Sequence, residues 1–154
     1  MSRVRPTREG LAAWRAILEL HRTALPLLDA ELSAGTPLDL QQYDALLHVL
    51  EAGPEGIRMT DLARGIVLSK SGLTALVDRL ENDGLVRRTP DPDDRRAYRI
   101  VLTEEGEAAF RSAASVHEAG IHRHVTSKLS RDEAVTIATA LRRVEESLRP
   151  GAGA

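Results

Sequence analysis

The 154-residue sequence lacks cysteine, and it contains only one tryptophan, one phenylalanine and two tyrosines. Without cysteine the chain has no thiol nucleophile, no cysteine-ligated zinc and no disulfide switch. The small number of aromatic residues also argues against an aromatic cage around a cofactor. We therefore expect no cofactor, and we expect any sensing to be independent of thiol oxidation.

Long apolar runs and an excess of one charge are missing too. The apolar runs are only a few residues long, whereas a membrane span needs roughly 20. The first six residues, Met-Ser-Arg-Val-Arg-Pro, lack the apolar core of a signal peptide. The 21 basic residues nearly balance the 23 acidic ones, for a net charge of -2. These features predict a soluble, cytoplasmic protein with no membrane partner, built as one domain over residues 1–154.

Motifs of common enzyme classes are also absent. The sequence has no glycine-rich phosphate loop after a strand, no Gly-x-Ser-x-Gly nucleophile elbow and no His-Glu-x-x-His zinc motif. We therefore predict that the protein is not an enzyme.

What the sequence does contain is helical periodicity at both ends. From Thr7 onwards apolar residues recur at steps of three and four, which predicts one long helix with a kink at Pro26. Asp39 and Gln42 have the spacing of a capping box at the start of a second helix. A further helix begins near Thr103 and extends to about Ser127, and a last one follows a capping box at Ser130. We predict that residues 7–38 and 104–149 form a helical dimerisation region.

The middle of the chain has the layout of a helix-turn-helix. Thr60 is the predicted cap of a short helix, and Ser69 is the predicted cap of a second helix that Gly84 closes. Two strands at 85–89 and 97–102 follow, separated by a loop with two prolines and three aspartates. The predicted fold is therefore mostly α-helical, with residues 39–103 forming a winged helix-turn-helix lobe that carries a small β-hairpin.

Near-neutral charge by itself argues against nucleic-acid binding, because DNA-binding domains usually carry a basic excess. The charge is distributed unevenly, however. Residues 85–102 contain five arginines and three aspartates, so the predicted hairpin has a net charge of +2 in a chain that is net negative. The helix that starts at Ser69 offers small hydroxyls, one cation and free backbone amides at its first turn, all able to meet DNA. A wing arginine suits a narrow minor groove, and Asp94 can hold one arginine so that another projects.

The segment from Met59 to Arg88, MTDLARGIVLSKSGLTALVDRLENDGLVRR, is followed by Asp-Asp-Arg-Arg at 93–96 and Leu-Thr-Glu-Glu-Gly at 102–106. Together these motifs closely resemble the MarR family of bacterial transcriptional regulators, and with the flanking helices the resemblance covers about nine-tenths of the chain. It implies a homodimer on a pseudo-palindromic operator in double-stranded DNA. Such a protein is usually a repressor that a small phenolic or other aromatic ligand releases.

The resemblance also implies which residues contact DNA. The predicted set is Thr60, Ser69, Lys70, Ser71, Thr74, Ala75, Arg79, Arg88, Asp94, Arg95 and Arg96. Arg79 has two interpretations, a phosphate contact or an internal salt bridge with Asp78 or a neighbouring acid. Many relatives have a polar or basic residue where this chain has Ala75, so shape is expected to contribute more to recognition here.

Several residues allow more than one interpretation. Trp14, Tyr43, Leu47 and His48 are candidates for a ligand pocket, and equally for core or dimer interface. A zinc-responsive regulator using His48 and His117 is an alternative, although Ile121 stands where a second ligand four residues after His117 would be needed. Asp91, Asp93 and Asp94 could suggest a metal site, but a solvated turn is the preferred interpretation. A winged scaffold that binds protein and not DNA is the alternative from another class.

Overall fold

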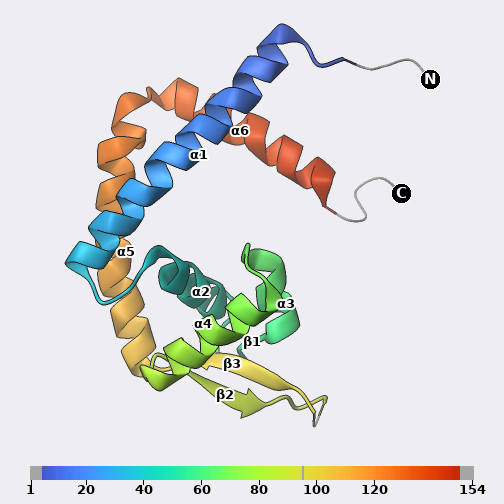
Figure 1. Ribbon diagram of the computed structural model, residues 1–154, viewed down its shortest axis with the longest axis vertical. Coiled ribbons are helices and arrows are strands. Elements are labelled where there is room, and N and C mark those ends of the chain that lie inside the picture. Colours follow the sequence, from blue (N-terminus) through green and yellow to red (C-terminus); the bar gives the residue numbers. More distant parts are fainter. Residues whose placement is uncertain (1–4, 95, 150–154) are drawn as a thin grey trace. The chain divides into compact units, whose positions relative to one another are not determined.

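The computed structural model describes residues 5–94 and 96–149. These residues divide into two compact units, one up to Glu118 and the other from Ala119 onwards. Within the described residues, no helix combines the length and the apolar character that a membrane crossing requires. The predicted fold class is confirmed: the chain is mostly helical, with one small antiparallel sheet (Figure 1).

The first two helices begin and end where their capping residues predict. Helix α1 spans Arg8–Gly35, with Thr7 as its N-cap, and continues through Pro26 without a break in the helix. Helix α2 spans Leu40–Glu51, and the predicted capping box between Asp39 and Gln42 is present. A carboxylate of α1 adds a third bond, because Asp29 accepts the Leu40 backbone N–H at 2.8 Å. The start of α2 is therefore fixed to α1.

Helices α3 (Met59–Gly65) and α4 (Lys70–Asn82) form the helix-turn-helix. Ser69 caps α4 as predicted, accepting the Gly72 N–H at 3.1 Å. The predicted cap at Thr60 is wrong. Helix α3 begins at Met59, two residues earlier than a cap at Thr60 implies. Its N-cap is Arg58, which makes no side-chain cap bond, and Thr60 lies exposed in the first turn.

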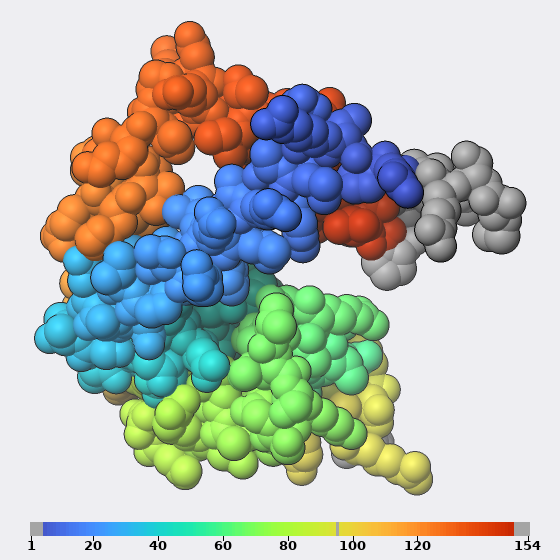
Figure 2. Space-filling view, turned by 45° about the horizontal axis from the view of Figure 1, so that its top comes forward, coloured from blue at the N-terminus to red at the C-terminus, as the bar shows by residue number. Residues whose placement is uncertain are grey.

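The sheet has three strands in the order β1-β3-β2. Strands β2 (Val86–Pro90) and β3 (Tyr98–Leu102) form the predicted hairpin, whose tip protrudes from the surface (yellow in Figure 2). Strand β1 (Ile57–Arg58) comes from a segment that the sequence pattern presents only as a link. Two residues are too short to show an alternating pattern, so pairing with β3 decides their conformation.

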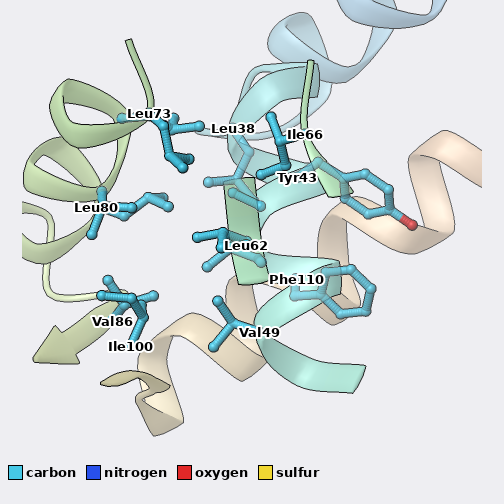
Figure 3. Packing of buried hydrophobic residues seen from close by; sticks show 14 of the residues in the cluster. Leu38, Tyr43, Val49, Leu62, Ile66, Leu73, Leu80, Val86, Ile100 and Phe110 are labelled. Carbon is cyan, nitrogen blue, oxygen red and sulfur yellow. The ribbon is translucent and has the colours of Figure 1, made fainter. Parts of the chain in front are cut away.

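The core of the first unit lies where the sheet meets the helices around it. Leu62 of α3, Leu80 of α4, Ile100 of β3 and Val49 of α2 are each at most 1% exposed (Figure 3). Phe110 of α5 joins the same cluster. Helices α2 and α4 are therefore held on the sheet by one continuous apolar core, which leaves the opposite face of α4 outside.

Helix α5 (Glu104–His124) starts directly on the turn that follows α4. The Thr103 hydroxyl donates to the carbonyl oxygens of Gly84 at 2.7 Å and Leu85 at 2.9 Å, and it accepts the Gly106 N–H. A Cβ on Gly106 would lie 1.9 Å from the Leu85 oxygen, so only glycine permits this approach. The end of α4 and the start of α5 are thus joined backbone to backbone.

The predicted extension of α5 to Ser127 is wrong by one turn. The helix ends at His124, and a short 3-10 turn, η1 (Thr126–Lys128), follows. Helix α6 (Arg131–Leu148) then begins with the predicted capping box of Ser130 and Glu133, and none of its residues is buried.

Candidate nucleic-acid interface

Helix α4 has one buried face and one exposed face. Leu73, Leu76, Val77 and Leu80 are buried, in agreement with the predicted apolar stripe. The exposed face carries the five predicted DNA contacts on this helix's first turns: Ser69, Lys70, Ser71, Thr74 and Ala75. All five residues are exposed to solvent.

The hydroxyls on this face already have partners within the helix. Ser69 Oγ accepts the Gly72 N–H and lies 3.3 Å from Ser71 Oγ. Thr74 Oγ1 donates to the Lys70 carbonyl at 3.0 Å. The Thr74 hydroxyl can therefore still accept a hydrogen bond from a base, while donating one would require it to leave the helix carbonyl.

Arg79 and Arg88 both form ion pairs within the molecule. Arg79 lies 3.4 Å from Asp39, the capping residue of α2, and this supports the salt-bridge interpretation with an acid that is distant in sequence. Arg88 pairs with Asp78 at 2.5 Å and also with Glu81, which additionally accepts its backbone N–H. Arg88 therefore holds β2 on α4, and its guanidinium is committed to that contact.

Asp91 is the residue that organises the hairpin, and the sequence did not single it out for this role. Its side chain is fully buried and accepts bonds from Arg58 at 2.7 and 2.9 Å and from Arg99 at 2.9 Å. It also accepts the backbone N–H groups of Asp93 and Asp94. The Arg58 guanidinium above all holds the pKa of the Asp91 carboxyl well below its usual range. The solvated-turn interpretation is therefore wrong for Asp91, which ties β1, β3 and the loop together.

The remaining loop residues shape the tip. The Asp94 carboxylate accepts the Arg96 backbone N–H at 2.9 Å, and the Asp94 carbonyl accepts the Ala97 N–H. Asp94 thus sets the backbone of the turn. Arg96 is exposed there, and Arg95 lies outside the described residues.

Replacing Asp91 with asparagine is expected to weaken DNA binding about tenfold, comparable to the loss of one arginine contact. Asparagine carries no charge and replaces one acceptor oxygen with an NH2 donor that faces other donors, so the anchor of the hairpin is weakened while the helices remain. Fluorescence anisotropy with a selected DNA site measures the affinity, and circular dichroism checks the helix content. Asp93→Asn is the matched control, because the Asp93 side chain is 75% exposed and lies 3.7 Å from both arginines. Wild-type affinity of Asp91→Asn would show that the anchor is irrelevant to binding.

A second group of candidate residues lies around Tyr43. The Tyr43 ring stacks on Phe110 at 5.0 Å and meets the ring of His117 at 4.7 Å. His117 Nδ1 is buried and has no hydrogen-bond partner among the described residues. The sequence drew attention to His117 only as a possible zinc ligand, and nothing in its spacing indicates a partner of Tyr43.

The other pocket candidates lie in different surroundings. Leu47 is half-buried against the core, and Trp14 is 56% exposed on α1. His48 lies within 3.9 Å of Asp44 and Glu51, and its ring is so close to Gly65 that an added Cβ there would lie 2.7 Å away. Over the described ranges, no group of three or more His, Asp or Glu side chains is placed to hold a metal ion.

Comparison with known proteins connects this geometry to a family. The MarR family profile matches residues 36–97. The transcriptional regulator PecS of Dickeya dadantii (strain 3937) is 32% identical over 112 residues, which are 72% of this chain and 67% of PecS. AbsC, a MarR family transcriptional regulator from Streptomyces coelicolor, is 34% identical in a structural match over 95% of this chain and 98% of AbsC, with a TM-score of 0.81.

A further solved structure is that of Sco3205, a MarR family transcriptional regulator from the same organism, in complex with DNA. It matches with a TM-score of 0.85 and 29% identity, over 97% of this chain and 94% of that one. The winged lobe, the exposed face of α4 and these matches lead to one conclusion. The chain belongs to the MarR family of DNA-binding transcriptional regulators, and not to any class of enzyme.

Proposed function

We propose that the protein is a homodimeric repressor that binds a pseudo-palindromic DNA site and is released by a small aromatic ligand. Each copy contributes α4, placed in the major groove, and the tip of the β2–β3 hairpin, where one of Arg95 and Arg96 enters the minor groove. The observation that carries the proposal is the arrangement of α4. Its apolar face is packed in the core, and its first turn is exposed. The solved complex of Sco3205, a structural match, with DNA supports DNA as the partner.

Exposed apolar side chains support the homodimer. Helix α1 exposes Leu11, Trp14, Ile17 and Leu18, and helix α6 exposes Ile137, Leu141, Val144 and Leu148. An amphipathic helix with no buried residue gains little stability by itself, so these faces need a cover. A second copy supplies apolar surfaces of the same kind, and residues 7–38 and 104–149 are the proposed dimerisation region around the lobe at 39–103.

The dimer is tested by sedimentation equilibrium at micromolar concentration. The wild-type protein is expected to sediment with twice the mass of the chain. Leu141→Asp places a charge in the apolar stripe of α6 and is expected to shift the protein towards monomer, with at least about a tenfold loss of affinity for a two-half-site DNA. Thr139→Asp introduces the same charge on the opposite side of α6 and should behave as wild type. A monomeric wild-type protein would refute the proposed assembly.

The group around Tyr43 supports a ligand site in the first unit. Tyr43, Phe110 and His117 provide aromatic faces, and the unpartnered His117 Nδ1 can bond an oxygen of a phenol or benzoate. Ligand binding would change the spacing of the two α4 helices, which must match about 34 Å on DNA. Titration of the DNA complex with simple phenols and benzoates tests this proposal. Release by such a compound should disappear in His117→Phe while DNA binding persists, and equal release from both proteins would place the ligand elsewhere.

Acidification is expected to destabilise the folded protein through His117. Burial lowers the pKa of this imidazole, and the nearby carboxylates of Asp44 and Glu118 only partly oppose the effect. Between the lowered folded pKa and the usual value of about 6.5, the unfolded chain binds more protons, so the free energy of unfolding rises with pH. This contribution is complete above about pH 6.5 and is lost as pH falls below it.

Urea unfolding at several pH values, with the protein concentration held constant, measures this dependence. His117→Phe keeps a ring beside Tyr43 and should show a shallower rise of stability with pH than the wild type. His122→Phe changes an exposed histidine of the same helix and should retain the wild-type dependence. The same steepness in His117→Phe as in wild type would rule out His117 as the source.

A further inference from the structure

Val67 lies in the turn between α3 and α4 and is the most exposed of the large apolar residues described, at 101%. Its two neighbours in sequence point the other way. Ile66 is 7% exposed, and Leu68 packs against the core. The backbone N–H of Leu68 donates to the carbonyl of Ile66 at 3.0 Å, which closes a tight turn with Val67 at its corner. The buried Ile66 and the half-buried Leu68 therefore hold the valine outward.

Val67 is exposed next to the predicted DNA-binding surface of α4. Single exposed apolar residues are common on protein surfaces and usually need no explanation. Val67, however, stands two residues before Ser69, the N-cap of the helix that presents the predicted DNA contacts. Its β-branched side chain has few rotamers, so the methyl groups are presented almost rigidly. The turn thus carries a stiff apolar group at the border of a polar surface.

The hydroxyl groups near Val67 are already used in hydrogen bonds within α4, so an apolar side chain can add base recognition that they do not supply. Ser69 and Thr74 already use their hydroxyls inside α4, to accept from Gly72 and to donate to Lys70. In the major groove the C5-methyl of thymine is the one apolar group that a base pair presents. A fixed valine beside the start of α4 is chemically matched to that methyl and to no other base edge.

Resting on the proposed DNA binding through α4, we infer that Val67 is a specificity-determining residue that contacts the methyl group of a thymine in each half-site. The contact is apolar, so it selects thymine over cytosine without a hydrogen bond. Loss of the contact in one half-site should lower DNA affinity about three- to tenfold, and only changes at that one base position should have this effect.

The experiment uses the full chain and a duplex that the wild-type protein selects from random DNA. Each thymine is replaced in turn by deoxyuridine, which removes only the methyl group, and affinity is measured at constant salt. One thymine per half-site should weaken wild-type binding about three- to tenfold when replaced. Val67→Ala removes the contact from both half-sites at once, so it should bind the unmodified duplex about ten- to hundredfold more weakly and lose its response at this thymine alone. Val135→Ala makes the same change one turn before Thr139, on the side of α6 opposite the apolar stripe, and it should keep the full wild-type pattern.

Two results would overturn the inference while DNA binding stands. Identical responses of wild type and Val67→Ala at every thymine would show that Val67 reads no methyl group. An equal loss for Val67→Ala on selected and random DNA would place the valine against the sugar-phosphate backbone. If the wild-type protein selects no sequence at all, the proposed function fails together with the inference. Circular dichroism of Val67→Ala should match the wild type, because the side chain is not packed.

Discussion

Replacing Gly106 with alanine is expected to lower the free energy of unfolding by at least about 3 kcal/mol, a large part of the stability of a typical domain. The new Cβ would lie 1.9 Å from the Leu85 oxygen and 2.8 Å from its carbonyl carbon. Both are backbone atoms, so no side-chain rotation relieves the overlap. The same oxygen accepts two bonds from Thr103, and moving it away would break them as well.

Urea unfolding followed by circular dichroism measures this loss. Gly35→Ala is the matched control, because a Cβ there meets only the Val116 side chain at an ordinary 3.4 Å. At the end of α1 that change should stay within about 1 kcal/mol of wild type and could be slightly stabilising. If Gly106→Ala falls within 1 kcal/mol of wild type as well, the close approach of α5 to the α4 turn is not rigid.

The double change Arg95→Ala and Arg96→Ala is expected to weaken binding to the selected site by about 2–4 kcal/mol, from roughly 1–2 kcal/mol for each charge-assisted contact. The hairpin that carries these residues is anchored by Asp91, and Asp94 sets the backbone at Arg96. An arginine presented by an anchored loop loses less freedom when it binds a narrow minor groove.

Fluorescence anisotropy at constant salt measures this effect. Arg142→Ala with Arg143→Ala removes the same charge from α6 and controls for the change in net charge. That control should bind within about twofold of wild type. Wild-type affinity of the Arg95→Ala, Arg96→Ala variant would show that the hairpin arginines do not contribute to DNA binding. Helix α4 would then be the one DNA-binding element of the lobe.

Local patterns predicted most of the fold, because the bonds that begin each helix join residues only three positions apart. Thr7, Asp39, Ser69 and Ser130 all cap helices as predicted. The short strand β1 escaped prediction, because two residues cannot display a period and pairing with β3 alone defines them. The start of α3 was misplaced at Thr60, because that helix begins without any capping side chain.

The candidate site was predictable in its residue types but not in its pairings. The sequence counts Arg88 and Arg99 as cations of the hairpin, yet the fold places Arg88 beside the half-buried Glu81 and Arg99 beside the buried Asp91. Asp91 is separated in the sequence from Arg58 by 33 positions and from Arg99 by eight. Helix and strand periodicity does not predict pairs at these separations. The resemblance to a family located the lobe, and only the three-dimensional arrangement separates structural arginines from available ones.

The internal ion pairs bear on how the protein responds to its ionic surroundings. Five arginines of the lobe, Arg58, Arg64, Arg79, Arg88 and Arg99, are paired with carboxylates. Within the part of the chain that the structure describes, Lys70, Arg87 and Arg96 remain without an ion pair in this lobe. Each phosphate that a cation neutralises releases condensed counterions and adds about -0.9 to the slope of log affinity against log salt. With so few unpaired cations per copy, the proposed dimer is expected to lose little affinity for its site as ionic strength rises, and to bind bulk DNA weakly.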